Sequence, residues 1–348
     1  MSFNLNKLVR PNIQKMVAYS SARSEFKGKA DVFLDANENP FDTGLNRYPD
    51  PLQRQLKKEI SAIKNVPTEQ IFLGNGSDEA IDLLIRIFCE PQRDHIITVP
   101  PTYGMYKVSA AISDIEVKTV LLTEDFQLRP KAILAEANQH SKILFLCSPN
   151  NPTGNDVNRA DIEFLLEKFK GVVVVDEAYI DFSELPSCTT LLEKYPNLVV
   201  LQTFSKAWGL AGIRLGMAFA SKAIIQLFNK VKPPYNVNQL TQTAALEALQ
   251  NKQQRAEWNT TILEQRNWLI EQLEQIAVVE KVYPSAANFL LFKIENPNDW
   301  YNYLVQQGVI IRNRSTVVLC DGCLRVTVGT PSENQRFVNL LQSRLVNV

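Results

Sequence analysis

Short apolar segments alternate with amphipathic helical segments from about residue 70 to residue 206, and this alternation limits the possible folds more than any other feature. The apolar segments include HIITV (95–99), KILFLC (142–147), GVVVVDEAY (171–179) and NLVVLQTFSK (197–206). They are rich in Val, Ile and Leu and lack polar alternation, which is typical of strands buried on both faces. The pattern predicts an α/β domain with a mostly parallel central sheet flanked by helices.

The chain of 348 residues is long enough for this large domain and a smaller one. We expect residues 34–245 to form the large domain. The sequence then becomes polar and rich in Gln and Glu, which predicts a long helix over about 243–277, followed by two β segments, a helix and a hairpin. Residues 246–348 are therefore expected to form a small α+β domain. Residues 1–33 are expected to form an arm that packs on the small domain or on a partner subunit.

Two local signals lie near the C-terminus. Asp321-Gly322 stands between two strand-like runs in TVVLCDGCLRVTV (316–328), which predicts a tight hairpin. Thr330-Pro331-Ser332-Glu333 has the pattern of a helix start, with a capping box and Pro at the first helical position.

Composition narrows the possible functions. The 37 Lys and Arg residues equal the 37 Asp and Glu residues, so we expect no nucleic-acid partner. No segment has the length and apolarity of a membrane span or a signal peptide, and the five scattered cysteines fit a reducing compartment, so a cytoplasmic protein is expected. With two histidines in the chain, a His-based metal site is not expected. A hairpin turn explains the spacing of Cys320 and Cys323 better than zinc does.

Polar residues follow the predicted strands, and ligands of open parallel sheets bind at the carboxyl ends of the strands. GNGSDEA (74–80) follows a strand and begins a helix, where Gly76 permits close backbone approach and the next N–H groups could bind a phosphate. The alternative is an ordinary helix cap at Ser77, with Asp78 in the first turn. CSPNNPTG (147–154) ends another strand in a loop that could contact a ligand or serve only as a turn.

Asp176 ends a strongly apolar strand, where an unpaired carboxylate would be costly to desolvate. A protonated pyridine nitrogen would be a suitable cationic partner, and pyridoxal phosphate (PLP) sites require such a residue. Tyr179, three residues later, could then donate to the phenolic oxygen of the ring. The alternative is a strand-end Asp that accepts hydrogen bonds from backbone amides.

Lys206 also follows a buried strand, in TFSKAWGLAGIRLGMAF (203–219). Desolvation and the nearby charge of Arg214 would lower its pKa, as suits a nucleophile that forms a Schiff base. Ser205 and Arg214 suit a phosphate. The alternative is a solvated surface lysine beside a flexible loop.

Taken together, these segments resemble the fold type I PLP enzymes of the aspartate aminotransferase superfamily, and within it most closely the histidinol-phosphate aminotransferases. The resemblance extends collinearly over nearly the whole chain. It is carried by LDANENP (34–40), RYPDP (47–51), GNGSDEAI (74–81), PTYGMY (101–106), SPNNPTG (148–154), DEAYIDF (176–182), TFSKAWGLAGIRLG (203–216) and CLRVTVGT (323–330).

The resemblance implies a role for each candidate residue. Lys206 would carry PLP as a Schiff base and act as the general acid and base. Asp176 would pair with the pyridine nitrogen. The other implied cofactor contacts are Gly76, Ser77, Ser205 and Arg214 at the phosphate, Asn151 and Tyr179 at the ring oxygen, Tyr103 on the ring face, Tyr48 of the partner subunit at the phosphate, and Asp78 as a further cofactor-binding residue. Tyr103 and Tyr48 could instead be ordinary core or interface aromatics.

The resemblance also implies the substrates and the assembly. Arg312 and Arg325 would receive the phosphate of L-histidinol phosphate and the carboxylates of L-glutamate or 2-oxoglutarate, with Tyr19 and Tyr235 as weaker candidates for the same pocket. Taken alone, either arginine could be an exposed strand charge. The implied active unit is a homodimer with shared sites.

Three alternatives stay open at this point. An aromatic amino-acid aminotransferase or an amino-acid-phosphate decarboxylase could use the same scaffold. A non-catalytic PLP-binding module would not require Lys206, Asp176, Tyr179 and Arg214 together. A nicotinamide-dependent dehydrogenase is disfavoured because GNGSDE (74–79) lacks the third glycine of the dinucleotide motif.

Overall fold

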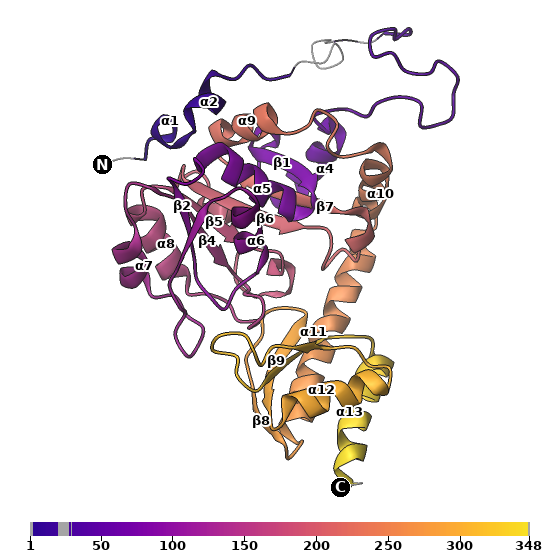
Figure 1. Cartoon of the computed structure of the whole chain (residues 1–348). Helices are drawn as coiled ribbons and strands as arrows, with labels where there is room; N and C mark the ends of the chain where they lie inside the picture. Colours follow the sequence, from indigo (N-terminus) through magenta and orange to yellow (C-terminus); the bar gives the residue numbers. More distant parts are fainter. Residues whose placement is uncertain (1–2, 20–27, 29, 347–348) are drawn as a thin grey trace.

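The computed structural model describes residues 3–19, 28 and 30–346, which form two domains. The large domain contains the first seven strands, and the small domain contains the last four. Figure 1 shows the small domain below the large one, with a long helix, α11 (Lys252–Glu274), running between them.

The large domain is built on a seven-stranded sheet in the order β1-β7-β6-β5-β4-β2-β3. Its strands from β2 to β6 run parallel, and β7 is antiparallel to both of its neighbours. The loop from β6 to β7 is too short for a parallel crossover, which explains the reversal of β7. The prediction of a mostly parallel sheet is confirmed. The strands are β1 (Ile71–Asn75), β2 (His95–Thr98), β3 (Glu116–Thr119), β4 (Ser141–Cys147), β5 (Val172–Asp176), β6 (Leu198–Thr203) and β7 (Leu215–Ala220).

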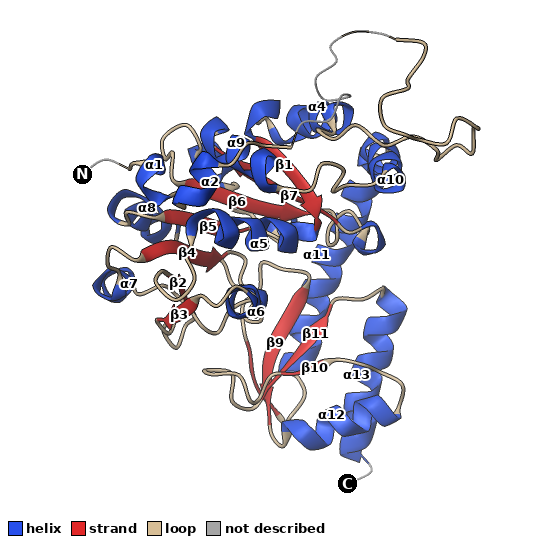
Figure 2. Ribbon diagram, turned by 45° about the horizontal axis from the view of Figure 1, so that its top comes forward, coloured by secondary structure: helices blue, strands red, loops and turns tan. Residues whose placement is uncertain are grey.

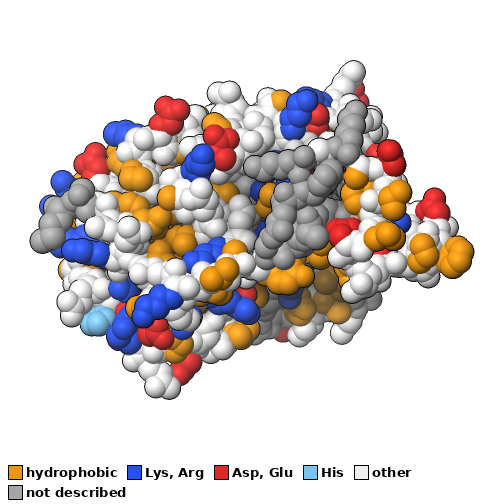
Figure 3. All heavy atoms as spheres, turned by 90° about the horizontal axis from the view of Figure 1, so that it is seen from above, with side chains coloured by type: hydrophobic (Ala, Val, Ile, Leu, Met, Phe, Trp, Pro, Cys, Tyr) orange, Lys and Arg blue, Asp and Glu red, His pale blue; other side chains and the backbone are white. Residues whose placement is uncertain are grey.

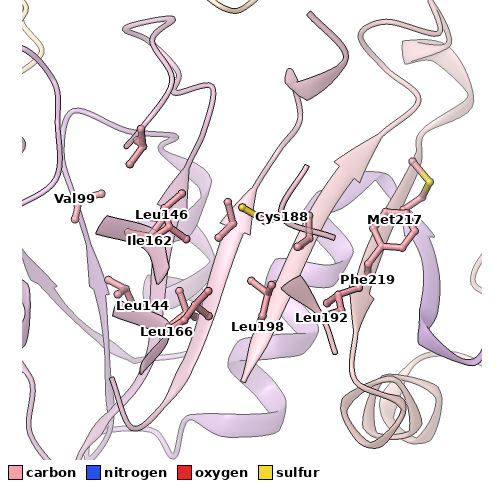
Figure 4. Packing of buried hydrophobic residues seen from close by; sticks show 14 of the residues in the cluster. Val99, Leu144, Leu146, Ile162, Leu166, Cys188, Leu192, Leu198, Met217 and Phe219 are labelled. Carbon is pink, nitrogen blue, oxygen red and sulfur yellow. The ribbon is translucent and has the colours of Figure 1, made fainter. Parts of the chain in front are cut away.

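Both faces of this sheet are buried. Along β4, Leu144 and Leu146 pack into the core on one face, while Ile143 and Phe145 pack into the core on the other. Figure 4 shows Leu144 and Leu146 beside side chains of the covering helix α8. Such burial requires an uninterrupted apolar strand, as the sequence has. The first face is covered by α4 (Arg54–Lys64), α7 (Pro130–Glu136), α8 (Arg159–Lys168) and α10 (Gln239–Gln250), and the second by α5 (Gly76–Phe88), α6 (Met105–Ile112) and α9 (Lys222–Val231).

The small domain has a four-stranded antiparallel sheet in the order β10-β11-β9-β8. One face packs on α11, α12 and α13 in a separate core, as Figure 2 shows from the side. On the other face, Leu291 and Cys323 join the core of the large domain. Its elements after α11 are β8 (Val279–Val282), β9 (Phe289–Ile294), α12 (Pro297–Gln306), β10 (Arg312–Asn313), β11 (Cys323–Thr327) and α13 (Pro331–Val346).

The single helix predicted over about 243–277 is wrong, because the chain forms two helices that meet at Asn251. The buried Ala245 and Leu249 of α10 join the large core, whereas Leu269 and Leu273 of α11 join the small core. A straight helix could not direct these residues to two different domains. The predicted domain boundary at residue 245 falls within α10, which packs on α4 of the large domain.

The predicted tight hairpin is only partly right. The backbone turns at Asp321-Gly322, where the N–H of Cys323 donates to the carbonyl of Cys320 at 3.0 Å. However, residues 316–320 form no strand, and β11 pairs instead with the short β10. Val317 and Leu319 pack against the large core rather than extend a ladder. The capping box before α13 is confirmed, since the backbone N–H of Thr330 donates to Glu333 Oε2 at 2.8 Å.

The N-terminal arm differs from its prediction. Its helices α1 (Leu5–Leu8) and α2 (Pro11–Lys15) pack on the large domain, not on the small one. Val9 and Ile13 are buried in the core beside α5 and α9, and the Arg10 guanidinium pairs with Glu90 at 3.1 Å. Residues 20–27 and 29 of the arm lie outside the described residues, and packing on a partner stays a prediction.

Residues 32–45, at the end of the arm and directly after it, carry exposed apolar side chains. Val32, Leu34, Phe41 and Leu45 are all more than half exposed. Figure 3 shows hydrophobic atoms on the surface of the segment that projects from the body of the molecule.

No helix within the described parts of the chain combines the length and apolarity needed to cross a bilayer.

Candidate active site

A cavity of about 620 Å³ lies at the carboxyl ends of the large-domain strands and is closed on one side by the small domain. It brings together residues from segments that are far apart in the sequence. The predicted site residues that line it are Gly76, Ser77, Asp78, Tyr103, Asn151, Asp176, Tyr179, Ser205, Lys206, Arg214, Arg312 and Arg325.

Asp176 provides a buried carboxylate at the base of this cavity. It ends β5, and only 2% of its surface is exposed. Its Oδ2 accepts a hydrogen bond from the Tyr106 hydroxyl at 2.8 Å, and its Oδ1 accepts one from the backbone N–H of Ala178 at 3.1 Å. Burial raises the pKa of Asp176 to about 6, although both hydrogen bonds act to lower it. The carboxylate therefore still favours a cationic partner.

Tyr106 was not among the predicted site residues. It is fully buried on α6 and stacks on Phe145, with the ring centres 4.6 Å apart. Its sequence signal is its place in PTYGMY (101–106), a motif that also contains the predicted site residue Tyr103. A tyrosine on a helix reveals no hydroxyl partner by spacing alone, because its partner here lies 70 residues away.

Lys206 lies in the loop after β6, with its Nζ 5.4 Å from the centre of the Tyr179 ring. Burial lowers the pKa of Lys206, and the positive charges of Arg325 and Arg214 lower it further, while Asp176 opposes them. The expected effect of Arg214 is thus present, but Arg325 of the small domain acts more strongly. A larger fraction of the amine is neutral, and able to act as a nucleophile, than in a solvated lysine.

The turn from β1 to α5, residues 75–78, is the predicted phosphate site, and for that reason we call it the phosphate-binding turn. Gly76 has φ +68°, and its N–H donates to the carbonyl of Arg214 at 2.7 Å. A Cβ on Gly76 would lie 2.9 Å from Arg214 Nη2. The turn places the first N–H groups of α5, Ser77 and Arg214 at one end of the cavity.

Asp78 lies in the same turn but is engaged with protein groups. Its Oδ1 accepts a hydrogen bond from the Tyr103 hydroxyl at 3.0 Å, and its Oδ2 lies 3.6 Å from Arg214 Nη2. These contacts fit a residue that orients Tyr103 and Arg214.

The small domain contributes three arginines. Arg325 of β11 donates from Nη1 to Asn151 Oδ1, and Asn151 Nδ2 donates to the Tyr179 hydroxyl at 3.4 Å. Arg312 pairs with Arg325 across the β10–β11 ladder. Arg314, which was not predicted, also lines the cavity, and its buried Nε has no hydrogen-bond partner among the described residues.

Alternation could have indicated Arg314, since residues 312 and 314 lie two apart at a strand and residues two apart face the same side. Burial and the charge of the neighbouring arginines lower the pKa values of Arg314 and Arg325. None of the three arginines forms an ion pair with a carboxylate within the described ranges. The cavity therefore has an excess of positive charge on this side.

Three predicted tyrosines lie outside the cavity of this chain. Tyr48 and Tyr235 stack on each other, with ring centres 4.4 Å apart and an interplanar angle of 14°. Tyr48 is half exposed, and Tyr19 is 74% exposed. The placement of Tyr235 and Tyr19 does not bring them to the arginines of their own chain, while a role for Tyr48 in a partner's site stays a prediction.

A comparison with protein-family models shows to which family the chain belongs. The model for aminotransferases of class I and II matches residues 29–341. The chain belongs to this family. It is 54% identical over 347 residues to the histidinol-phosphate aminotransferase of Cytophaga hutchinsonii, with 99% of this chain and 100% of that aminotransferase covered. The resemblance inferred from the motifs is thereby confirmed.

Solved aminotransferase structures have the same fold. The crystal structure of the histidinol-phosphate aminotransferase from Clostridium acetobutylicum matches with a TM-score of 0.81 and 26% identity, over 88% of this chain and 92% of that chain. The histidinol-phosphate aminotransferase from Sinorhizobium meliloti, solved in complex with pyridoxal-5'-phosphate, matches with a TM-score of 0.77 and 21% identity, over 86% and 83%.

Close packing at Gly216 gives a first prediction. A Cβ on Gly216 would lie 2.1 Å from the Ser77 nitrogen and 2.2 Å from the Gly76 carbonyl carbon. We expect Gly216→Ala to displace the phosphate-binding turn, to lower the free energy of unfolding by about 1–3 kcal/mol, and to weaken binding of inorganic phosphate. Urea unfolding and phosphate titration measure the two effects.

Gly212→Ala is the matched control, because a Cβ there meets no atom within 4 Å. It should change the free energy of unfolding by no more than about 0.5 kcal/mol. Equal effects of the two substitutions would show that the turn does not require the close approach.

Proposed function

We propose that this chain is a PLP-dependent aminotransferase that interconverts L-histidinol phosphate and 2-oxoglutarate with imidazole-acetol phosphate and L-glutamate. The observation that carries the proposal is that Lys206 and Asp176 share one cavity with Arg214 and the arginines of the small domain. The family and the 54% identity to a histidinol-phosphate aminotransferase support it.

The residues of the cavity fit the cofactor. Asp176 is a buried carboxylate with two hydrogen bonds and a raised pKa, so it can take a protonated ring nitrogen as its cationic partner. Asn151 and Tyr179 are the candidates for the ring oxygen, and Tyr103 for the ring face. The phosphate would be held by the N–H groups near Gly76 and by the side chains of Ser77, Ser205 and Arg214.

When bound, PLP supplies an electrophilic carbonyl carbon and a ring that stabilises negative charge on the substrate. The side chains of the cavity would supply the nucleophile, the proton transfer and the contacts that orient the cofactor. Lys206 would act as the nucleophile and then carry a proton between the α-carbon of the substrate and the former carbonyl carbon of the cofactor, since its lowered pKa makes Nζ a better proton acceptor and donor for this transfer than the amine of a solvated lysine. Asp176, held by the Tyr106 hydroxyl, would keep the ring nitrogen protonated.

The substrates would be distinguished by their anionic groups. Histidinol phosphate presents a phosphate, and glutamate presents two carboxylates. Arg325 and Arg312 face the cavity without carboxylate partners within the described ranges, so either group can receive charge-assisted hydrogen bonds there.

We also propose that the chain acts in the cytoplasm as a homodimer with shared sites. The exposed apolar residues between Val32 and Leu45 suit a surface that a second subunit covers. Tyr48, which follows this segment in the chain, would reach the cofactor phosphate of the partner. All five cysteines are buried thiols without disulfides, in keeping with a reducing compartment.

A substrate assay tests the reaction. With 2-oxoglutarate as acceptor, we expect rapid glutamate formation from L-histidinol phosphate and much slower formation from L-phenylalanine or L-tyrosine. Arg312→Gln should raise the KM for histidinol phosphate about tenfold or more, since it removes a charged hydrogen-bond donor. Rapid turnover of phenylalanine would instead favour an aromatic aminotransferase, and release of carbon dioxide would favour a decarboxylase.

Borohydride treatment of the holoenzyme tests the role of Lys206. We expect reduction to attach the cofactor irreversibly to the peptide that contains Lys206, as mass spectrometry would show. Lys206→Ala should abolish both this attachment and transamination, whereas Lys222→Ala, an exposed lysine at the start of α9, should leave both intact. Attachment that persists in Lys206→Ala would contradict the assignment.

The raised pKa of Asp176 predicts a pH dependence of cofactor binding. The pKa of the Asp176 carboxyl group is about 6 in the cofactor-free protein. Below that pH the group binds a proton and loses its charge, so PLP affinity should fall as the pH falls through 6. Asp176→Asn should bind PLP more weakly at pH 7.5. It should also lack the part of the pH dependence that the carboxylate causes.

Fluorescence titration of wild type and Asp176→Asn between pH 5 and 8 measures this difference. Protonation of the cofactor phosphate affects both proteins equally and cancels in the comparison. Parallel pH profiles would show that Asp176 does not govern cofactor binding.

A further inference from the structure

Lys232, at the end of α9, is a buried lysine without an ion-pair partner within the described ranges. Only 7% of its surface is exposed. Its Nζ donates to the carbonyl oxygens of Pro51 at 2.9 Å, Pro233 at 3.1 Å and Pro234 at 2.9 Å, and lies 3.1 Å from Asn236 Oδ1. Four oxygen atoms from two distant segments thus surround one ammonium group.

The two segments that Lys232 joins carry the stacked tyrosines. Pro51 ends the RYPDP segment (47–51) that contains Tyr48, and Pro234 directly precedes Tyr235. Lys232 therefore holds the two backbones together next to the Tyr48–Tyr235 stack.

Asn236 connects the ammonium group to the phosphate-binding turn. Its Oδ1 accepts from Lys232, and its Nδ2 donates to the carbonyl of Leu73 in β1 at 2.9 Å and to Glu79 Oε1 at 3.1 Å. Asn75 donates from Nδ2 to the carbonyl of Asn236, and its backbone N–H donates to Glu79. Asn75, the first residue of the turn, and Glu79, which directly follows the turn, are thus both hydrogen-bonded to Asn236.

We propose that Lys232 is a positioning residue for the phosphate-binding turn, acting through Asn236 and Glu79. The inference rests on the proposed function, in which this turn holds the cofactor phosphate. Lys232 does not line the cavity that would hold the cofactor and substrate. It sets where the first N–H groups of α5 point and fixes the tyrosine stack relative to them.

A charged group is needed at this position because four acceptors converge on it. An ammonium group has three donors and can bond all four oxygens if one donor is shared between two of them, whereas an apolar side chain of similar length would offer these oxygens no donor. Burial lowers the pKa of Lys232 to about 8, and Glu79 and Asp50 act against this shift, so the group is mainly protonated at pH 7. The cost of desolvating the charge is offset by its contacts with oxygen.

The rate of PLP release from the holoenzyme tests the inference. We expect Lys232→Met to release PLP about tenfold faster than wild type or more, because a charged hydrogen-bond network is lost. The affinity of the cofactor-free protein for inorganic phosphate should fall in parallel. Lys230→Met is the matched control, since Lys230 lies on the same helix and makes one contact, to the carbonyl of Gln14 at 2.9 Å. It should release PLP at the wild-type rate.

A double-mutant cycle separates positioning from simple loss of stability. Asn236→Ser removes the side-chain contacts with Leu73 and Glu79 but leaves the backbone carbonyl of residue 236 and the three carbonyl contacts of Lys232, so it also serves if Lys232→Met does not fold. In the combined variant, release should be no faster than in the more affected single variant, because both substitutions break one connection. Independent, multiplicative effects, or a lower melting temperature with unchanged release and phosphate affinity, would overturn the inference.

The same measurements distinguish this inference from the proposed function. A wild-type protein that binds phosphate but forms no reducible bond with PLP would contradict the proposed function alone. In that case, a loss of phosphate affinity in Lys232→Met but not in Lys230→Met would still support the positioning role. Equal phosphate affinity in both variants would refute it.

Discussion

The site depends on the burial of both faces of the large sheet. Helices cover each face, so the strand ends are where side chains of the sheet can reach a ligand. Asp176 lies at the end of β5, Lys206 follows β6, and Gly76 follows β1. The same burial shifts the pKa values of Asp176 and Lys206. Desolvation lowers the pKa of Lys206, which suits a nucleophile, and raises that of Asp176, which makes a cationic partner favourable for its carboxylate.

The second domain determines the charge of the cavity. Leu291 and Cys323 anchor the small sheet in the large core, while Tyr179 packs edge-on against Phe289 with ring centres 5.1 Å apart. This contact brings Arg325 close enough to influence the pKa of Lys206 more than Arg214 does. The nucleophile is therefore tuned partly by a residue that lies 119 positions later in the chain.

The parts of the structure that could be predicted are those encoded locally. Apolar runs predicted the buried strands. The position of Asp176 and Lys206 at the ends of such runs predicted that both belong to the site. The break at Asn251 could not be predicted, because it arises from two helices packing on different domains. Tyr106 was missed for a similar reason, since its hydroxyl is explained only by a carboxylate on another element. Arg314 is different, because its spacing from Arg312 was visible in the sequence.

The hydrogen bond from Arg325 to Asn151 affects how an anion enters the cavity. The amide oxygen of Asn151 occupies one of the five donors of the guanidinium, so a carboxylate that binds at this Nη1 would exchange with it. A neutral acceptor is replaced by a charged one, and the number of hydrogen bonds changes little. In the proposed reaction, selection of a substrate at this position would therefore depend on the charge of the ligand more than on the number of hydrogen bonds. Because Asn151 belongs to the large domain and Arg325 to the small one, the exchange also releases a tie between the two domains.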